Sequence, residues 1–234
     1  MKPAREPARR QAVGGFRPFE LLLVAAAVVA TLSSTVGWTA LHFVFKPLTM
    51  LLAISWVVVR ARQSGALGRF DALLVAALTA SLAGDVFLML PGGYFIPGLA
   101  SFLIAHLFYL ALFRQGVPWF PSRRALIAVL AVGAAMYAWV WTGLTDPVLK
   151  VAVAAYVGVI SLMVAQAIGR ASVQGDRACA AVALGACIFM LSDALIAVNR
   201  FVQPLPLAPL WVLSSYYAAQ LLMVHNARPD CSED

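Results

Sequence analysis

The chain alternates eight apolar stretches of 18 to 22 residues with short polar or turn-forming gaps. A helix that crosses a bilayer needs about 20 mostly apolar residues. The pattern therefore predicts an all-α fold, a polytopic membrane bundle of about eight transmembrane helices. The expected spans are residues 19–36, 41–59, 71–90, 95–113, 124–141, 149–168, 178–199 and 207–225.

The same pattern predicts a single transmembrane domain over residues 19–226. A basic tail at 1–18 precedes it, and a short tail at 227–234 follows it. No gap between spans is long enough for a soluble domain, so any function is expected inside the bundle or at its outer mouth.

Composition supports a membrane protein and excludes a nucleic-acid-binding one. Hydrophobic residues make up 62% of the chain and charged residues 12%, against about 45–50% and 25% in soluble domains. The net charge of +7 is spread over a tail and short gaps instead of one solvated face. The expected partner is the lipid bilayer, and nothing in the pattern specifies an oligomeric state.

The distribution of basic residues predicts the orientation of the bundle. Of the 17 Lys and Arg residues, 14 lie in the two tails and the even-numbered gaps, and Lys46 lies inside a span. The odd-numbered gaps hold only Lys150 and Arg200. Since basic residues collect on the cytoplasmic side, both termini are expected in the cytoplasm, in agreement with an even number of spans.

Ionisable groups are costly in the hydrocarbon region, so the few in these spans are the first candidates for a site. At about 1.5 Å per helical residue, they and their polar neighbours occupy one slab about 5–18 Å below the outer surface. Polar groups from five helices at one depth predict a shared cavity. The candidates are Lys46, Ser81, Asp85, His106, Tyr109, Asp193, Asn199, Arg200, Tyr216, Tyr217 and Gln220.

Helical spacing places several of these residues on common faces. Four pairs share a face: Ser81 with Asp85, His106 with Tyr109, Tyr216 with Gln220, and Asp193 with Arg200.

Structural interpretations stay open for each candidate. A protonated Asp85 or Asp193 could tie two helices together, and Lys46 could extend to the outer interface. His106 could satisfy a hydrogen bond in the core. Tyr216 and Tyr217 could belong to an aromatic belt, and Asn199 and Arg200 could cap a helix end.

The residue types favour acid–base chemistry over metal, protease or serine-hydrolase chemistry. His42 and His225 lie at opposite ends of the bundle, so they cannot join His106 around one ion, and no metal or cofactor is expected. The Gly-x-Gly-Asp motif of intramembrane aspartyl proteases and the Gly-x-Ser-x-Gly elbow are absent from the sequence. Two carboxyls beside a His and a Lys suit hydrolysis of an apolar substrate. They also suit the proton relay of a transporter, and spacing leaves both open.

Five segments in order resemble the YhhN family of membrane proteins, from about Lys46 to Val224. They are Lys46-Pro47-Leu48-Thr49, Ser81-Leu82-Ala83-Gly84-Asp85, Ala105-His106-Leu107-Phe108-Tyr109, Leu191-Ser192-Asp193 and Tyr216-Tyr217-Ala218-Ala219-Gln220-Leu221-Leu222.

The resemblance implies an eight-span lysoplasmalogenase in a bacterial inner membrane. Such an enzyme cleaves the vinyl ether bond of a lysophospholipid to a fatty aldehyde and glycerophosphocholine or glycerophosphoethanolamine. The implied catalytic residues are Asp85, Asp193, His106, Tyr216 and Gln220, with one aspartate as acid and the other as base. Lys46 and Arg200 would bind the substrate phosphate. A small-molecule or proton-coupled transporter and a lipid-binding sensor are the alternatives.

Overall fold

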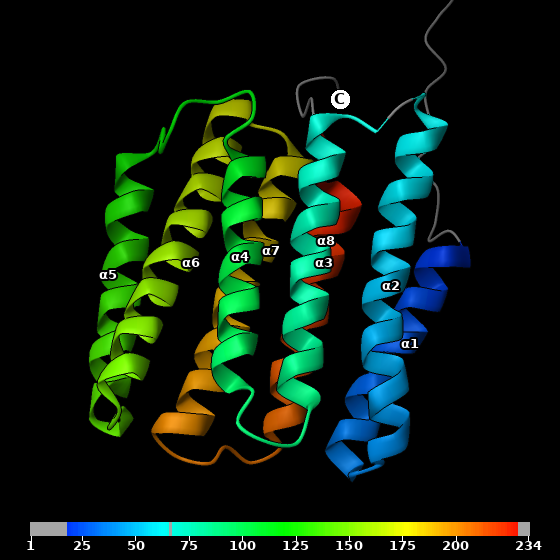
Figure 1. Ribbon diagram of the computed structural model, residues 1–234. Coiled ribbons are helices and arrows are strands. Elements are labelled where there is room, and N and C mark those ends of the chain that lie inside the picture. Colours follow the sequence, from blue (N-terminus) through cyan, green and yellow to red (C-terminus); the bar gives the residue numbers. More distant parts are fainter. Residues whose placement is uncertain (1–17, 66, 229–234) are drawn as a thin grey trace, which may run out of the picture.

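The computed structural model describes residues 18–65 and 67–228, and these fold into eight long helices (Figure 1). The all-α prediction is confirmed for this part of the chain. Residues 1–17 of the expected tail at 1–18, and residues 229–234 of the expected tail at 227–234, lie outside it. The helices are α1 (Pro18–Val36), α2 (Thr39–Gln63), α3 (Arg69–Met89), α4 (Phe95–Phe113), α5 (Arg123–Val140), α6 (Pro147–Gln174), α7 (Arg177–Phe201) and α8 (Ala208–Asn226), with a 3₁₀ turn, η1 (Trp141–Gly143), after α5.

Seven of these helices, α1 to α7, are long and apolar enough to cross a membrane. The eighth, α8, has 19 residues, as many as α1 and α4. It carries Tyr216, Tyr217 and Gln220, all buried, and these polar side chains lower its mean hydropathy. The bundle nevertheless encloses α8, which packs between α7 and α1.

Side chains at the polar gaps explain where several helices begin. The Ser122 hydroxyl accepts a hydrogen bond from the Ala125 amide at the start of α5. The Asp146 carboxylate accepts one from Val148 at the start of α6, where Pro147 takes the first position. Such caps satisfy amides that have no partner within the helix. At its other end α6 continues to Gly175, whose positive φ of 71° ends it.

Pro47 lies inside α2, as it does inside the expected span 41–59. The helix begins at Thr39, so the proline is its ninth residue. A proline has no amide hydrogen, so the carbonyl of Phe43 loses its helical partner one turn earlier. The residue just before this interruption is Lys46.

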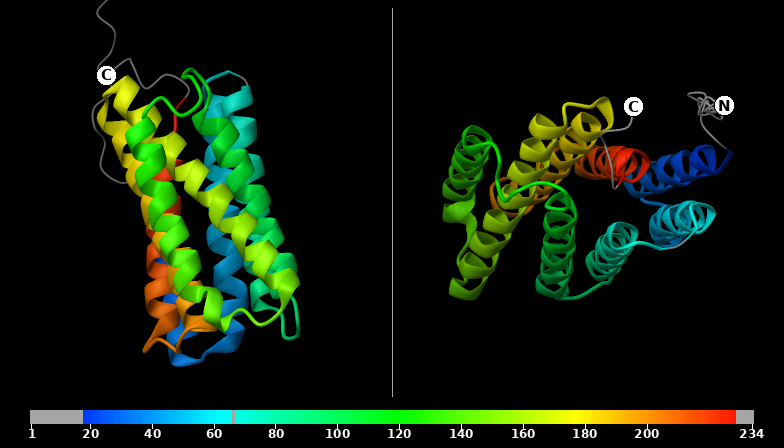
Figure 2. Two further views of the ribbon diagram at one scale, coloured as in Figure 1. Left: turned by 90° about the vertical axis from the view of Figure 1, so that its left-hand side faces the viewer. Right: turned by 90° about the horizontal axis from the view of Figure 1, so that it is seen from above.

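The helices form two rows, joined at one end by a helix pair (Figure 2). One row consists of α2, α3 and α4, and the other of α1, α8 and α7. The pair α5 and α6 closes one end, where α6 packs against both α4 and α7. Across the middle, the rows meet mainly through long side chains, and these include most of the candidate residues.

Glycines allow the closest helix contacts within the rows. A Cβ at Gly84 would lie 2.5 Å from the Phe102 ring, and one at Gly98 would lie 2.8 Å from Leu88, so both glycines let α3 and α4 approach. Gly185 plays the same part between α7 and α8, where an added Cβ would meet the Ala219 carbonyl at 3.0 Å.

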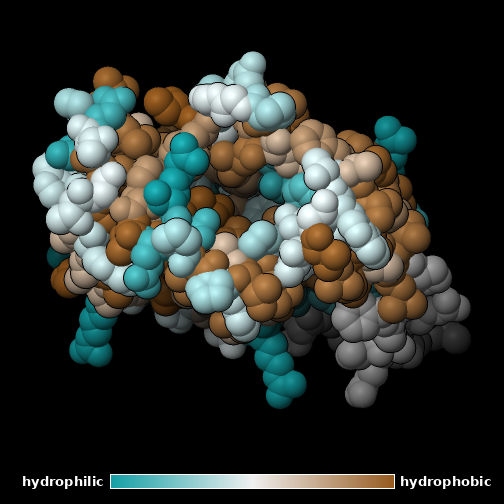
Figure 3. Space-filling view, turned by 90° about the horizontal axis from the view of Figure 1, so that it is seen from below, coloured by the Kyte–Doolittle hydropathy of each residue, from teal (hydrophilic) through white to brown (hydrophobic). Residues whose placement is uncertain are grey.

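Basic residues gather at one end of the bundle, the upper end in Figure 1, where the loops after α2, α4 and α6 lie. We call this the basic end. The opposite, turn-rich end holds the loops after α1, α3, α5 and α7. Figure 3 views the molecule from the turn-rich end, and both hydrophobic and hydrophilic residues border a hollow near the middle of that face. The basic end contains Arg60, Arg62, Arg69, Arg114, Arg123, Arg124, Arg170 and Arg177.

Candidate active site

The first polar cluster of the site joins α2, α3 and α8. The Lys46 ammonium lies 3.1 Å from one oxygen of the Asp85 carboxylate. The Tyr216 hydroxyl donates a hydrogen bond of 2.7 Å to the other oxygen. All three side chains are buried. Lys46 therefore points to Asp85 and not to the outer interface, and the buried carboxylate has both a cation and a donor.

The second polar cluster joins α4, α6 and α7. The Tyr156 hydroxyl donates a hydrogen bond of 2.6 Å to Asp193. The Nε2 atom of His106 lies 3.7 Å from the same carboxylate oxygen. Within the described residues, neither ring nitrogen of His106 has a hydrogen-bond partner, although the side chain is fully buried. No Lys or Arg described in the structure forms an ion pair with Asp193.

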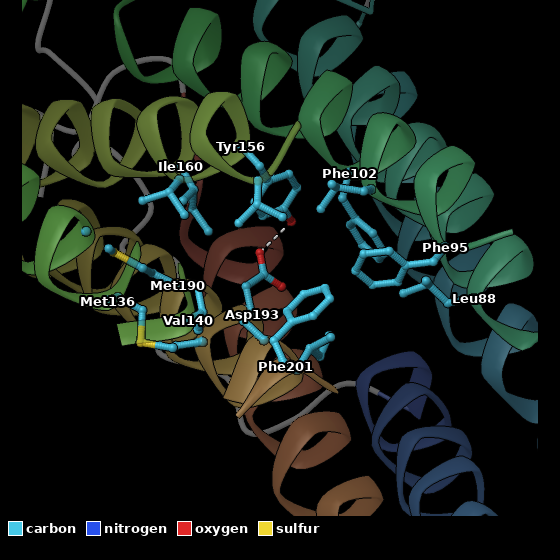
Figure 4. A pocket seen from close by; sticks show the side chains of 17 residues that line it. Leu88, Phe95, Phe102, Met136, Val140, Tyr156, Ile160, Met190, Asp193 and Phe201 are labelled. Carbon is cyan, nitrogen blue, oxygen red and sulfur yellow. Dashed lines mark hydrogen bonds between the residues drawn. The ribbon is translucent and has the colours of Figure 1, made fainter. Parts of the chain in front are cut away.

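Asp193 and Tyr156 lie in an apolar pocket between α3, α4, α5, α6 and α7 (Figure 4). Its empty space, with the open mouth included, is about 740 Å³. Figure 4 shows the carboxyl and the hydroxyl facing each other between hydrophobic walls. The labelled walls are Leu88, Phe95, Phe102 and Phe201 on one side and Met136, Val140, Ile160 and Met190 on the other.

The pocket extends from the turn-rich end to about the middle of the bundle. Phe95 is the first residue of α4 and Phe201 the last of α7, so both mark its mouth. Asp193 lies eight residues before Phe201 on α7, which is about 12 Å along the helix axis. The carboxyl is therefore near the inner part of a mostly apolar tunnel.

Aromatic rings separate the two polar clusters. The Phe189 ring lies 4.9 Å from the ring of His106 and 5.4 Å from that of Tyr216. Phe102 stands edge-on to Tyr216 at 6.0 Å. Asp193 lines the pocket and Asp85 does not. The two aspartates are thus neighbours across an aromatic wall and do not face each other in one chamber, as the sequence had led us to expect.

A further polar layer lies one helical turn toward the basic end. The Tyr109 hydroxyl donates a hydrogen bond of 2.6 Å to the side-chain oxygen of Gln220. The Gln220 amide nitrogen and the Ser81 hydroxyl are buried without a hydrogen-bond partner among the described residues. Tyr217 is buried as well, with its ring 5.3 Å from that of Tyr216. Buried polar atoms without a partner are unusual, and they cluster where a protein binds water or a ligand.

Asn199 and Arg200 lie apart from these clusters at the turn-rich end. The Asn199 side chain accepts a hydrogen bond of 2.8 Å from the Leu205 amide, so it holds the loop between α7 and α8. The Arg200 guanidinium lies 4.0 Å from the centre of the Phe95 ring, at the pocket mouth.

Sequence reasoning missed Tyr156, which has the shortest hydrogen bond to Asp193. It is the one tyrosine in the span expected at 149–168, which has no Asp, Glu, Lys or Arg after Lys150. A buried hydroxyl in such a span needs a partner, and this argument could have singled it out.

No group of three or more His, Cys, Asp or Glu side chains within residues 18–65 and 67–228 is arranged to hold a metal ion. The second cluster instead combines the Asp193 carboxyl in an apolar pocket with the Tyr156 hydroxyl, which orients it. His106 lies close enough to Asp193 for one water molecule to contact both. These groups can transfer protons to and from an apolar substrate.

Fold and site together define a multi-pass membrane protein with buried acid–base groups beside an apolar pocket. The chain belongs to the YhhN family, whose family model matches residues 41–227, so the resemblance of the five segments is confirmed.

Several relatives are similar over most of their length. Lysoplasmalogenase TMEM86B of Homo sapiens is 32% identical over 191 residues, which is 82% of this chain and 76% of the relative. The protein of the same name from Sus scrofa is 34% identical over 75% of this chain and 72% of its own. A lysoplasmalogenase of Mycobacterium tuberculosis is 32% identical over 67% of this chain and 60% of its own. No solved structure matches the chain significantly.

Proposed function

We propose that this protein is a membrane hydrolase that cleaves the vinyl ether bond of lysoplasmalogens. Its products would be a fatty aldehyde and glycerophosphocholine or glycerophosphoethanolamine. The names of the relatives support this substrate class. The single observation that carries the proposal is a carboxyl, Asp193, held by Tyr156 inside an otherwise apolar pocket.

Vinyl ether hydrolysis requires a proton on carbon. A general acid protonates the carbon distal to the ether oxygen, and the resulting oxocarbenium ion captures water. The water loses a proton to give a hemiacetal, which then breaks to the aldehyde and the free glycerol hydroxyl. The slow step needs a positioned acid and a negative charge close to the cation that forms.

Asp193 fits the part of the acid. Its carboxyl lies among apolar side chains, no Lys or Arg described in the structure pairs with it, and a positioned carboxylic acid can donate a proton to carbon. Once it has protonated the substrate, its carboxylate would stabilise the oxocarbenium ion and then accept the proton of the attacking water. Tyr156 would hold the carboxyl in place, and His106, with its nitrogens free, would orient the water.

Asp85 fits a different part. One oxygen of its carboxyl lies beside the Lys46 ammonium and the other accepts a hydrogen bond from Tyr216, so both are already engaged. In the proposed mechanism this cluster positions the Tyr216 and Phe189 rings beside the reaction pocket. Gln220 and Tyr109 would hold the water on the side away from the mouth.

We further propose that the basic end faces the cytoplasm of a bacterial cell and that the pocket opens to the outer face of its inner membrane. The excess of Arg at one end supports the orientation, and the mycobacterial relative supports the type of membrane.

Purified protein incubated with a lysoplasmalogen and, separately, with its saturated ether analogue tests the function. We expect fatty aldehyde from the first substrate and none from the second, because only a vinyl ether can be protonated to an oxocarbenium ion. Uptake of a solute into proteoliposomes without aldehyde would indicate a transporter. Saturable binding of the lipid without turnover would indicate a sensor.

A further inference from the structure

Two cations are close in sequence to residues that line the apolar pocket: Lys150 lies one helical turn before Val153, and Arg200 adjoins Phe201. Lys150 lies in the first turn of α6 and Arg200 in the last turn of α7, both at the turn-rich end. The Lys150 ammonium lies 4.2 Å from the centre of a Trp141 ring, and the Arg200 guanidinium lies 4.0 Å from that of Phe95. Both cations therefore rest on aromatic faces instead of on acidic partners.

Neither cation is neutralised by the part of the chain that the structure describes. No carboxylate oxygen lies within 4.0 Å of either one. Asp146, the one acidic residue in the described loops of this end, uses its carboxylate to cap α6 through the Val148 amide. Both cations can therefore bind an anion.

The backbone holds the two cations on one rim. A Cβ at Gly143 would lie 1.7 Å from the Phe201 carbonyl oxygen, so the turn η1 is packed directly against the end of α7. Trp141 belongs to this turn, and Arg200 adjoins Phe201. The Tyr137 hydroxyl donates a hydrogen bond of 3.1 Å to the Lys150 carbonyl and fixes the start of α6 beside α5.

Arg200 and Asp193 are also in register along α7. They are seven residues apart, two helical turns on one face and about 10 Å along the axis. In a single-chain glycerophospholipid, the three glycerol carbons separate the phosphate from the sn-1 ether oxygen. A phosphate at the rim therefore leaves the ether within reach of Asp193.

We propose that Lys150 and Arg200 form a phosphate subsite that anchors the headgroup of a single-chain phospholipid at the outer rim. The apolar pocket then holds the part of the molecule next to the bond that reacts. This assignment rests on the proposed function for the identity of that bond, but the binding of the phosphate is a separate property. The ligand class is a phosphodiester borne by a lipid, and not a free anion or an uncharged monoalkyl glycerol.

Binding is measured by calorimetry in detergent with two saturated, non-hydrolysable probes, an alkyl glycerophosphocholine and the matching alkyl glycerol. In the variant Lys150→Gln/Arg200→Gln, the phospholipid is expected to bind about 100-fold more weakly, since each of the two charge-assisted contacts contributes roughly tenfold in affinity. Binding of the alkyl glycerol is expected to be unchanged. Lys150→Arg/Arg200→Lys, which keeps both charges, should recover most of the affinity. Arg123→Gln, at the basic end, is the matched control and should bind both probes as the parent chain does.

Equal loss for both probes would mean that the substitutions damage the pocket, and equal affinity in variant and parent would mean that the rim holds no phosphate. Either result overturns the subsite. Competition by millimolar inorganic phosphate as effective as that by the lipid would also overturn it, because the site would then be one for free anions. The proposed hydrolysis is tested apart, since these probes release no aldehyde in any case.

Discussion

Lys46 and Asp85 form a buried ion pair, and removing either residue would leave the charge of the other without a partner. Their side chains are 9% and 3% exposed. Removing one member of a buried pair costs about 3–5 kcal/mol, because the other charge stays buried without its partner. The sequence allowed this pair to be anticipated in part, since both residues stood out as charges within spans. Their contact depends on the neighbouring positions of α2 and α3.

The single variant Lys46→Met should therefore lower the free energy of unfolding by about 3–5 kcal/mol. The double variant Lys46→Met/Asp85→Asn should be more stable than Lys46→Met, because no unpaired carboxylate remains. Thermal unfolding in detergent measures both. If the losses in unfolding free energy of Lys46→Met and of Asp85→Asn simply add in the double variant, the two residues are not coupled as their ion pair indicates.

The proposed contribution of Tyr156 to hydrolysis depends on one hydrogen bond, from its hydroxyl to Asp193. The variant Tyr156→Phe keeps the ring that packs against His106 and removes only the hydroxyl. Aldehyde release should fall about 10- to 100-fold, the worth of a bond to a charged or reacting carboxyl. The free energy of unfolding should fall by about 1–3 kcal/mol, because the carboxyl loses this hydrogen-bond partner. Tyr94→Phe is the control: Tyr94 is exposed, its ring stacks on Phe87, and the variant should hydrolyse the substrate like the parent chain. Full activity in Tyr156→Phe would remove this tyrosine from the mechanism.

The helices themselves could be predicted closely from the hydrophobic pattern. The expected span 95–113 coincides with α4, and seven other spans match helices to within a few residues at most ends. The larger differences are at the ends of α2 and α6, which continue past their apolar stretches to Gln63 and Gln174. Hydropathy has no signal for these turns, because they are helical without being apolar. Pro47 lies inside both the expected span 41–59 and α2, which begins two residues before that span, at Thr39.

The contact between α3 and α4 depends on Gly84. Gly84→Ala would force the Phe102 ring to move, since the new Cβ would lie 2.5 Å from it. We expect a loss of about 1–3 kcal/mol in unfolding free energy, as for other overpacked sites, and lower activity, because Phe102 lines the pocket and abuts Tyr216.

Gly158→Ala in α6 is the matched control for this prediction. An added Cβ there meets nothing within 4 Å, so it should leave stability unchanged or raise it by up to about 1 kcal/mol through helix propensity. Both are measured by thermal unfolding. If Gly84→Ala is as stable as Gly158→Ala, the close contact of α3 with Phe102 does not constrain the site.

At the scale of the whole molecule, the bundle divides its polar interior into two clusters. Depth in the membrane could be read from residue positions, and it correctly collected Lys46, Asp85, His106 and Asp193 into one layer of the bundle. Which helices are neighbours could not be predicted from residue positions, because a single sequence does not say which helices pack together. The aromatic wall of Phe102 and Phe189 between the aspartates therefore became visible only in three dimensions.

The proposed orientation predicts which loops face the outside of the cell. Thr145→Cys lies in the loop after α5, at the turn-rich end, and Ser64→Cys lies after α2, at the basic end. In intact cells, a membrane-impermeant maleimide should label Thr145→Cys above the level of the parent chain. It should label Ser64→Cys only after the membrane is permeabilised. The reverse pattern would invert the molecule and place the phosphate rim in the cytoplasm.

The central claim is that Asp193 delivers a proton to carbon within the apolar pocket. Its most direct test is hydrolysis of a lysoplasmalogen in D₂O. The aldehyde is trapped at once, and its deuterium content is determined by mass spectrometry. The account predicts one deuterium on the carbon next to the aldehyde group in the parent chain. It also predicts a loss of several orders of magnitude in rate for a folded Asp193→Asn variant. An undeuterated or shortened aldehyde, or a parent-like rate in Asp193→Asn, would contradict it.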